Sequence, residues 1–326
     1  MKASRATVSD SNLSFDDQEP PIPNLKEEVI KGLSSSPKTL NAKFFYDEKG
    51  SQLFEEITQL PEYYLTRTEI SILKNEIQNI KQTLGEETVL IEYGSGSSEK
   101  IKLMLEELNP QAYLPIDISK DFLLSAAEDL SAEFPDLPIH AICADYNEVV
   151  NIPTEFANSN KVAFFPGSTI GNFTPEDAKK FLSNVRQTIG DNGGLLIGVD
   201  VKKDKTALHN AYNDSQGVTA DFNLNMLSNV NELVNADFDL EQYEHDAFYN
   251  TEKGRIEMHL KSRSNQVVNI DNVQVTFAKG ERLHTENSYK YHVEEFIALA
   301  SKVGFKSKEV WIDKEEKFSV HYLQVA

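Results

Sequence analysis

A strand, a glycine turn and a helix follow one another in residues 88–108, and this succession constrains the fold more than any other part of the chain. An apolar run ends in Glu92, Gly94 and Gly96 follow, and an amphipathic pattern begins near Lys100. Glycine lets the backbone turn sharply and approach a ligand, because no Cβ stands in the way. The succession indicates a parallel α/β sheet with a ligand site at its strand ends, although glycine pairs also occur in such turns for conformational reasons alone.

The alternation of strand and helix patterns continues well beyond this turn. Strands are predicted at 88–93, 112–117, 138–144, 161–165 and 193–200, and helices at 98–108, 119–133 and 175–189. Such alternation predicts a parallel sheet with helices on both faces. After residue 200 the pattern changes to a helical stretch at 203–235 and antiparallel strands at 245–291, before a helix at 292–303 and strands at 307–313 and 318–325.

These patterns predict a Rossmann-like α/β domain with an inserted α+β domain. We expect residues 70–202 and 291–326 to form the Rossmann-like domain, and residues 24–69 and 203–290 to form the inserted one. Residues 1–23 are polar, acidic and contain proline, so they are predicted to be a disordered tail. The tail has no apolar segment typical of a secretory signal, and we therefore expect a cytoplasmic protein.

Composition excludes several classes of function. The 326 residues have a net charge of −20 and no cluster of lysine and arginine, which argues against binding to nucleic acid or to an anionic membrane. No apolar run is long enough to span a bilayer. The single cysteine, Cys143, excludes a disulfide within the chain and a cysteine-rich zinc site, and the seven histidines lack metal-ligand spacing. No metal is expected.

Acidic residues at the next two strand ends suggest which ligand the glycine turn serves. Asp117 follows the turn by roughly 20 residues, the spacing of a carboxylate that binds ribose hydroxyls. Ser98 replaces the third glycine of the dinucleotide pattern, so a nucleoside such as S-adenosylmethionine fits better than a pyrophosphate. Asp145, followed by Tyr146, could accept a hydrogen bond from an adenine amine, or could simply be a turn residue.

Two further segments carry candidate groups for a second ligand. The loop at 165–175 contains Asn172, whose amide can donate to and accept from an amino acid, although its two glycines could equally make a structural turn. Glu286 and Ser288 lie two residues apart in a predicted strand and therefore on one face. A carboxylate and a hydroxyl so placed could hold both nitrogens of an imidazole; the alternative is a solvated polar face.

Taken together, six segments resemble one family. They are YDEKGSQLFEEITQLPEYYLTRTE at 46–69, EYGSGSSEK at 92–100, GSTIGNFTP at 167–175, GVTADFNLN at 217–225, RIEMHL at 255–260 and TENS at 285–288. The chain resembles, from about residue 25 to its end, the histidine-specific, S-adenosylmethionine-dependent Nα-methyltransferases that open ergothioneine biosynthesis. Leu65 and Tyr93 depart from the residues common in the family, and neither is a proposed contact.

The resemblance implies a class I methyltransferase fold, an activity and a set of roles. It implies transfer of methyl groups from S-adenosylmethionine to the α-amine of L-histidine, up to the betaine hercynine, by a monomer. The implied cofactor-binding residues are Gly94, Gly96, Lys100, Asp117, Asp145 and Tyr146. The implied catalytic residues, which also hold the amino acid, are Tyr63, Asn172 and Tyr212, and the implied substrate contacts include Met258, Glu286 and Ser288.

Two other hypotheses stay open at this point. The same cofactor could methylate another aromatic amino acid or amine, although such an acceptor needs no carboxylate facing an imidazole N–H. The chain could also bind an adenosyl nucleoside without turning anything over. Turnover with histidine, tryptophan and tyrosine distinguishes these hypotheses.

Overall fold

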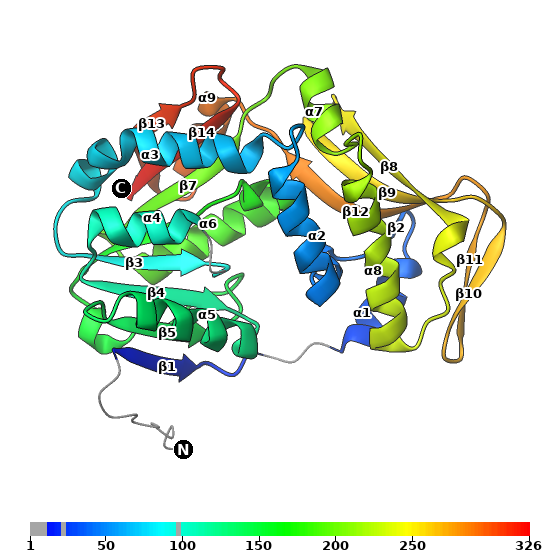
Figure 1. The fold of residues 1–326 in the computed structure, drawn as a ribbon, viewed down its shortest axis with the longest axis horizontal. Coiled ribbons are helices and arrows are strands. Elements are labelled where there is room, and N and C mark those ends of the chain that lie inside the picture. The colour runs from blue at the N-terminus through cyan, green and yellow to red at the C-terminus, as the bar shows by residue number, and fades with distance from the viewer. Residues whose placement is uncertain (1–11, 21–23, 96–98) are drawn as a thin grey trace.

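The computed structural model describes residues 12–20, 24–95 and 99–326, which form a large sheet and a smaller one that lie next to each other (Figure 1). The large sheet has eight strands in the order β1-β5-β4-β3-β6-β7-β14-β13. All neighbours are parallel except β14, which runs antiparallel to both β7 and β13. The strands are β1 (Leu13–Asp17), β3 (Thr88–Tyr93), β4 (Ala112–Asp117), β5 (Ile139–Cys143), β6 (Asn160–Phe165), β7 (Gly194–Asp200), β13 (Phe305–Ile312) and β14 (Phe318–Val325).

Helices cover both faces of the large sheet because its central strands are apolar on both sides. Successive residues of β3 alternate between two apolar clusters, with Leu90 in one and Val89 and Ile91 in the other. The first cluster includes residues of α3 (Leu65–Leu84), α4 (Glu99–Leu108) and α5 (Lys120–Glu133), and the second includes residues of α6 (Pro175–Ile189) and α9 (Val293–Ser301). The predicted α/β class is confirmed, and the strands and helices of residues 88–200 begin and end within a residue of their predicted bounds.

The smaller sheet has four strands in the order β2-β12-β9-β8, with β10 and β11 forming a separate hairpin. Its strands are β2 (Lys38–Thr39), β8 (Tyr243–Asn250), β9 (Arg255–Ser262) and β12 (Arg282–Tyr289), and the hairpin consists of β10 (Gln266–Ile270) and β11 (Val273–Phe277). The helices of this part are α1 (Leu25–Leu33), α2 (Glu48–Gln59), α7 (Lys205–Ala211) and α8 (Val218–Val234), with the 3-10 turns η1 (Ala42–Phe45) and η4 (Leu240–Gln242). Two further 3-10 turns, η2 (Thr154–Phe156) and η3 (Thr169–Asn172), follow β5 and β6 of the large sheet.

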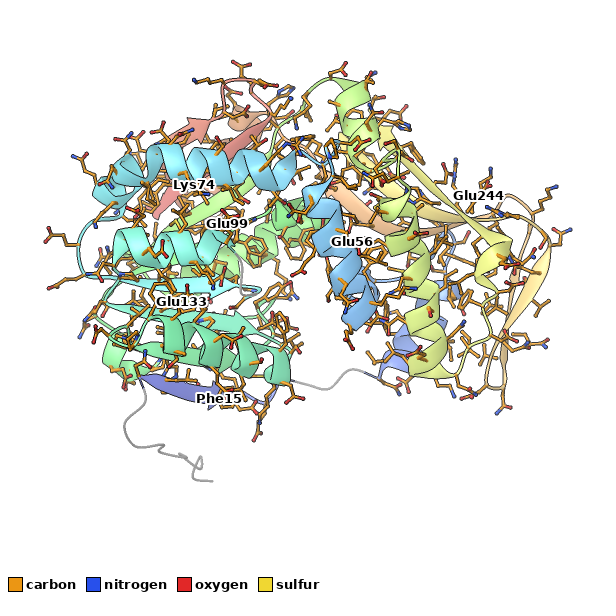
Figure 2. The ribbon with its side chains drawn as sticks, in the orientation of Figure 1. Phe15, Glu56, Lys74, Glu99, Glu133 and Glu244 are labelled. Carbon is orange, nitrogen blue, oxygen red and sulfur yellow. The ribbon has the colours of Figure 1, made fainter. Side chains whose placement is uncertain are left out.

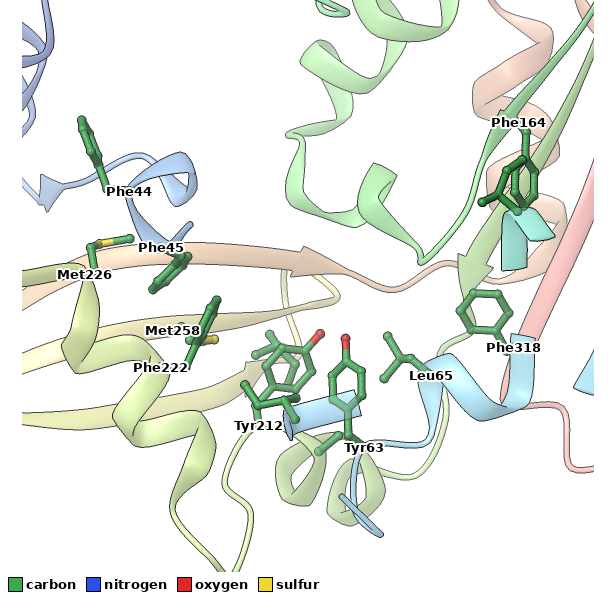
Figure 3. Packing of buried hydrophobic residues seen from close by; sticks show 14 of the residues in the cluster. Phe44, Phe45, Tyr63, Leu65, Phe164, Tyr212, Phe222, Met226, Met258 and Phe318 are labelled. Atoms are coloured by element: carbon green, nitrogen blue, oxygen red, sulfur yellow. The ribbon is translucent and has the colours of Figure 1, made fainter. Parts of the chain in front are cut away.

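The core of the smaller sheet is continuous with one face of the large sheet. Met258 and Leu260 of β9 and Met226 of α8 belong to the same apolar cluster as Leu73 of α3 and Leu90 of β3 (Figure 3). The bounds of the two predicted domains stay a prediction, but the polypeptide enters the smaller sheet and leaves it near residues 200 and 291, where Tyr291 N–H donates to the carbonyl of Asp200 at 3.1 Å.

The predicted disordered tail is wrong for residues 13–17. Residues 13–17 form β1, which adds a parallel strand to β5 at the edge of the large sheet (Figure 2, where Phe15 is labelled). Leu13 and Phe15 alternate and pack against the core, and the side-chain amide of Asn12 donates to the carbonyls of Phe134 and Leu137 at 2.8 and 2.6 Å. The alternating run Leu-Ser-Phe at 13–15 is too short to indicate a strand against the acidic composition around it, which predicts disorder.

Candidate active site

The glycine turn after β3 places two backbone N–H groups against the neighbouring strand. The N–H groups of Gly94 and Ser95 both donate to the carbonyl of Ile116 on β4, at 3.0 and 3.1 Å. Gly94 has a φ of 74°, a conformation that suits glycine. A Cβ there would make only an ordinary contact, 3.8 Å from a ring carbon of Tyr146, so the backbone conformation rather than crowding favours glycine. Gly96, the second predicted turn residue, lies outside the described residues.

Asp117, Asp145 and Tyr146 lie together at the ends of β4 and β5, as the sequence predicts. Asp117 accepts from the N–H of Ser119 at 2.8 Å, while Asp145 accepts from the backbone and side chain of Asn147. Burial, together with the nearby carboxylates of Asp117 and Asp145, raises the pKa of the Tyr146 phenol to about 12. The three side chains and Gly94 therefore form one group, which we name the nucleoside group.

A buried acid below the glycine turn was not predicted to belong to the site. Glu92, the last acid of β3, is 1% exposed, and the phenol of Tyr113 donates to it. Ser95 Oγ lies 3.1 Å from the same phenol oxygen. Burial raises the pKa of Glu92 to about 7. From the sequence, Glu92 is only the acid that ends a strand, because no local pattern shows that its side chain is enclosed.

Lys100 contacts Glu69 in this structure. Its ammonium lies 2.7 Å from Glu69 Oε2, and the N–H of Gly167 donates to both oxygens of Glu69 at 3.0 and 2.9 Å. Gly198 on β7 allows this arrangement, because a Cβ there would stand 2.1 Å from Glu69 Oε1. Lys100, Glu69 and Gly167 thus connect α4 and α3 to the loop that leads to Asn172. Sequence reasoning missed Glu69, although it is the last residue of a family motif.

Asn172 reaches the smaller sheet because η3 packs directly on β12. A Cβ on Gly171 would stand 2.8 Å from the carbonyl of Tyr289 and 3.5 Å from Ser288 Oγ, so only glycine allows this approach. The next residue, Asn172, is the last of η3 and is partly exposed. Its backbone neighbour Gly171 thus contacts β12, and the Asn172 amide makes no hydrogen bond to the described residues.

A bulge in β12 turns Glu286 toward the core side of the sheet. Strict alternation would place His284 on the same face as Glu286 and Ser288, but the pairing with β9 shifts between His284 and Glu286. Glu286 pairs with Met258 and Ser288 with Ile256, both core residues, whereas His284 pairs with His259 on the opposite face. The prediction that Glu286 and Ser288 share a face is confirmed.

Tyr63, Tyr212 and Tyr46 interact electrostatically with the carboxylate of Glu286. The rings of Tyr63 and Tyr212 lie 6.5 Å apart, and their hydroxyls point to the same side (Figure 3). Burial raises the pKa of both phenols well above its usual value, and Glu286 raises it further. Burial also raises the pKa of Glu286 to about 7, against the opposing effect of Lys290. We name Tyr63, Asn172, Tyr212, Met258, Glu286 and Ser288 the acceptor group.

Tyr46 connects the two groups. Its phenol interacts electrostatically with Tyr146 of the nucleoside group and with Glu286 and Tyr212 of the acceptor group. The residue is 49% exposed, although it stacks edge-on against Phe45 and Phe54. Tyr46 is the first residue of the family motif at 46–69, but the sequence alone assigns it no role. Its position indicates that a ligand on each side would come close to the other.

A buried ion pair lies behind the acceptor group. Lys290 and Asp200 are both fully buried, and the ammonium lies 2.6 Å from Asp200 Oδ2. Burial by itself would raise the pKa of Asp200, but Lys290 and Lys203 outweigh it and hold that pKa below its usual value. The phenol of Tyr64 donates to Asp200 at 2.9 Å. The sequence alone assigns no role to Lys290, Asp200, Lys203 or Tyr64, because no local pattern shows that such side chains are buried together.

Within the described residues, the acidic and histidine side chains form no cluster of three that could hold a metal ion, and no helix is long and apolar enough to cross a membrane. The arrangement is a nucleoside group and an acceptor group, with Tyr46 interacting electrostatically with both.

Comparison with known proteins identifies the family. The model of the histidine-specific, S-adenosylmethionine-dependent methyltransferases matches residues 25–325. The chain belongs to this family. The resemblance and the cofactor class predicted from the sequence are thereby confirmed.

Individual relatives agree with the assignment to histidine-specific methyltransferases. The chain is 40% identical over 303 residues to the histidine N-alpha-methyltransferase of Mycolicibacterium smegmatis, covering 91% of this chain and 93% of that one. It is 31% identical to ergothioneine biosynthesis protein 1 of Neurospora crassa over 92% of this chain, but only 35% of that longer protein. It is also 27% identical to the 4-dimethylallyltryptophan N-methyltransferase of Claviceps purpurea, over 93% of this chain and 95% of that one.

Proposed function

We propose that this methyltransferase transfers methyl groups from S-adenosylmethionine to the α-amino group of L-histidine, up to the trimethylated betaine hercynine, as the first step of ergothioneine biosynthesis. The observation that supports histidine most directly is the placement of Glu286 and Ser288 on one face of β12, beside Tyr212 and Asn172. A carboxylate accepts from one ring N–H while a hydroxyl serves the other nitrogen. The names of the relatives support the same acceptor.

The acceptor group has suitable residues for both ends of histidine. Met258 is 2% exposed and pairs with Glu286, so its thioether forms an apolar wall beside the carboxylate. Tyr63, Asn172 and Tyr212 would hold the backbone end of the amino acid. These are neutral hydrogen-bonding groups, which suits an amine that gains methyl groups and progressively loses its N–H donors.

The hydrogen-bonding side chains of the nucleoside group suit S-adenosylmethionine. Asp117 uses one oxygen for Ser119 N–H, and its second oxygen has no hydrogen bond to a described residue, which leaves it for ribose hydroxyls. Asp145 and Tyr146 would hold the adenine, and the absence of a side chain at Gly94 lets the backbone approach the ligand. When bound, S-adenosylmethionine supplies a methyl group on a positively charged sulfur.

The protein contributes orientation to this reaction. Tyr46 interacts electrostatically with both groups, so an amine held by Asn172 and the tyrosines is proposed to face the bound cofactor for in-line displacement. The amine must present its lone pair. No general base is needed if the amine binds deprotonated. Lys100 and Glu69 hold the loop before Asn172 in place through the N–H of Gly167.

The test is mass spectrometry of a reaction with histidine and S-adenosylmethionine. We expect gains of one, two and three methyl groups on histidine. A chain that binds S-adenosylhomocysteine yet adds no methyl to any amino acid would contradict the proposal and favour a non-catalytic binder.

A second acceptor class deserves the same assay, because a relative that acts on a tryptophan derivative is 27% identical. Competition with tryptophan and tyrosine separates the two functions. Histidine is expected to be methylated in preference to both, since an indole would leave Ser288 or Glu286 without a partner. The monomeric state and cytoplasmic location stay predictions; light scattering after size exclusion checks the first.

A further inference from the structure

Lys290 lies directly behind the residues that would read the imidazole. Its ammonium donates to Ser288 Oγ at 2.8 Å, to the phenol oxygen of Tyr212 at 3.1 Å, and to Asp200 Oδ2 at 2.6 Å. An ammonium has three donors and no acceptor, so all of its hydrogens are used. The side chain is fully buried, and Asp200 is fully buried with it. Such a lysine is fixed in place and keeps a constant donor role.

The hydrogen bonds of Ser288 are constrained by these contacts. A hydroxyl oxygen has two lone pairs and one proton. Lys290 donates to one lone pair, and the phenol of Tyr212 donates to the other at 2.8 Å. Both lone pairs are occupied, and the hydroxyl proton of Ser288 must therefore point to whatever lies in front of it. Ser288 can only donate to a ligand.

We propose that Lys290 is a positioning residue that makes Ser288 a compulsory donor, so that the site selects the neutral imidazole, in the single tautomer whose N–H faces Glu286. This inference rests on the proposed function. The imidazolium ion has two N–H donors and no acceptor, so it would place an N–H against the Ser288 proton. The other neutral tautomer would do the same and would also leave Glu286 facing a lone pair.

Lys203 provides a matched comparison for Lys290. It also pairs with Asp200 and lies 2.6 Å from the phenol oxygen of Tyr64, but has no hydrogen bond to Ser288 or Tyr212. Removing Lys203 therefore disturbs the same buried carboxylate without releasing Ser288. Removing Lys290 leaves Asp200 its contacts with Lys203 and Tyr64, so the carboxylate keeps a cation.

The first experiment needs only the unchanged protein and the two β-pyrrolylalanines, each of which lacks one ring nitrogen of histidine. The isomer that keeps its N–H toward Glu286 is expected to be methylated with a raised KM. The isomer whose N–H faces Ser288 should be disfavoured at least 10-fold more, because two donors then oppose each other. Equal use of both isomers would overturn the proposal.

The second experiment compares Lys290→Met, Lys203→Met and Ser288→Ala by the ratio of kcat/KM for histidine to that for the accepted pyrrole. Lys290→Met should lower this ratio roughly 3- to 10-fold, the effect of one hydrogen bond, because the Ser288 proton can then turn toward Tyr212. The double variant with Ser288→Ala should lose no more than Ser288→Ala alone. Lys203→Met should keep the ratio of the unchanged protein.

The outcomes separate this inference from the proposed function. If Lys290→Met folds and keeps the ratio while Ser288→Ala loses it, the positioning role is wrong although histidine methylation stands. If the unchanged protein adds no methyl to histidine, the proposed function fails first. If Lys290→Met does not fold, the pyrrole comparison on the unchanged protein still decides whether Ser288 donates.

Discussion

The nucleoside group and the acceptor group are built in different ways. Gly94, Asp117 and Asp145 follow three strands that are neighbours in the order β5-β4-β3, so short stretches of sequence bring them together. The acceptor group collects side chains from the segment between α2 and α3, from η3, from the residue after α7, and from β9 and β12. The first kind of site is a property of the sheet edge, whereas the second exists only after the whole chain has folded.

The charges of the two groups differ as well. Asp117 and Asp145 are partly exposed, and one oxygen of each accepts from a nearby backbone N–H group. Glu286 is also partly exposed but has no hydrogen bond to a described residue, and the Lys290–Asp200 pair behind it is fully buried. A ligand at the acceptor group therefore donates to a carboxylate that accepts from no described residue. Specificity is expected to depend mainly on the acceptor group.

Glu286→Ala should have the largest effect on this comparison. We expect kcat/KM for histidine to fall about 100-fold, because a charge-assisted hydrogen bond and the imidazole discrimination are lost together, while the affinity for S-adenosylhomocysteine stays the same. Steady-state kinetics and calorimetric titration measure the two quantities. Glu244→Ala, on β8 of the same sheet and paired at the surface with Lys261 and Arg263, is the control and should retain activity. An equal fall in cofactor affinity would remove the distinction between the groups.

Gly171→Ala should separate η3 from β12. The added Cβ would meet backbone atoms of Tyr289 at 2.8 and 3.2 Å, so we expect the free energy of unfolding to fall by about 1–3 kcal/mol and activity with histidine to fall with it. Gly280→Ala is a useful control, since its φ of 86° makes alanine strained but no atom lies within 4 Å. It should lose stability in chemical denaturation and keep its turnover. Full activity in Gly171→Ala would place Asn172 outside the acceptor group.

Asp117→Asn tests the nucleoside group. Replacing a carboxylate by an amide weakens hydrogen bonds from ribose hydroxyls, so the dissociation constant for S-adenosylhomocysteine should rise roughly 10-fold. The preference for histidine over tryptophan should not change. Asp121→Asn, in the first turn of α5, is the matched exposed control. A changed amino-acid preference in Asp117→Asn would mean that the two groups are not independent.

The pH dependence should be the smallest of these effects. Glu286 accepts an N–H more strongly when ionised, and its pKa is raised to about 7 by burial, so kcat/KM for histidine should fall as the pH drops below 7. Histidine's own ring protonates near pH 6.5, which steepens the fall. The profile of Glu286→Gln should therefore be shallower between pH 6 and 7. Identical slopes would show that Glu286 does not titrate in this range.

The same pKa has a consequence for stability, with its own sign. The folded protein holds the Glu286 proton up to about pH 7, whereas the unfolded chain releases it near the ordinary value of 4.5. The unfolded state thus binds fewer protons in between, and the contribution of Glu286 to stability is lost as the pH rises through this window. Glu286→Gln should gain in Tm relative to the unchanged protein at pH 8 and lose that gain at pH 4.

Much of the fold follows from local pattern, and the exceptions have physical causes. The strands and helices of residues 88–200 were predictable because each strand is mostly apolar and each helix is amphipathic. β1 was missed because it is an edge strand whose order comes from pairing with β5 and from the Asn12 hydrogen bonds, contacts more than 100 residues away in sequence. The buried pair of Lys290 and Asp200 was missed for the same kind of reason.

The sequence by itself determined the parallel sheet, the glycine turn, the acids at successive strand ends and the family, because these depend on spacing within a few tens of residues. Only the tertiary structure decided that a bulge directs Glu286 inward and His284 outward, that Gly171 lets Asn172 approach Ser288, and that Lys290 occupies the oxygen of Ser288. Strand alternation is local, but burial and the direction of a hydrogen bond depend on which distant groups pack around a side chain.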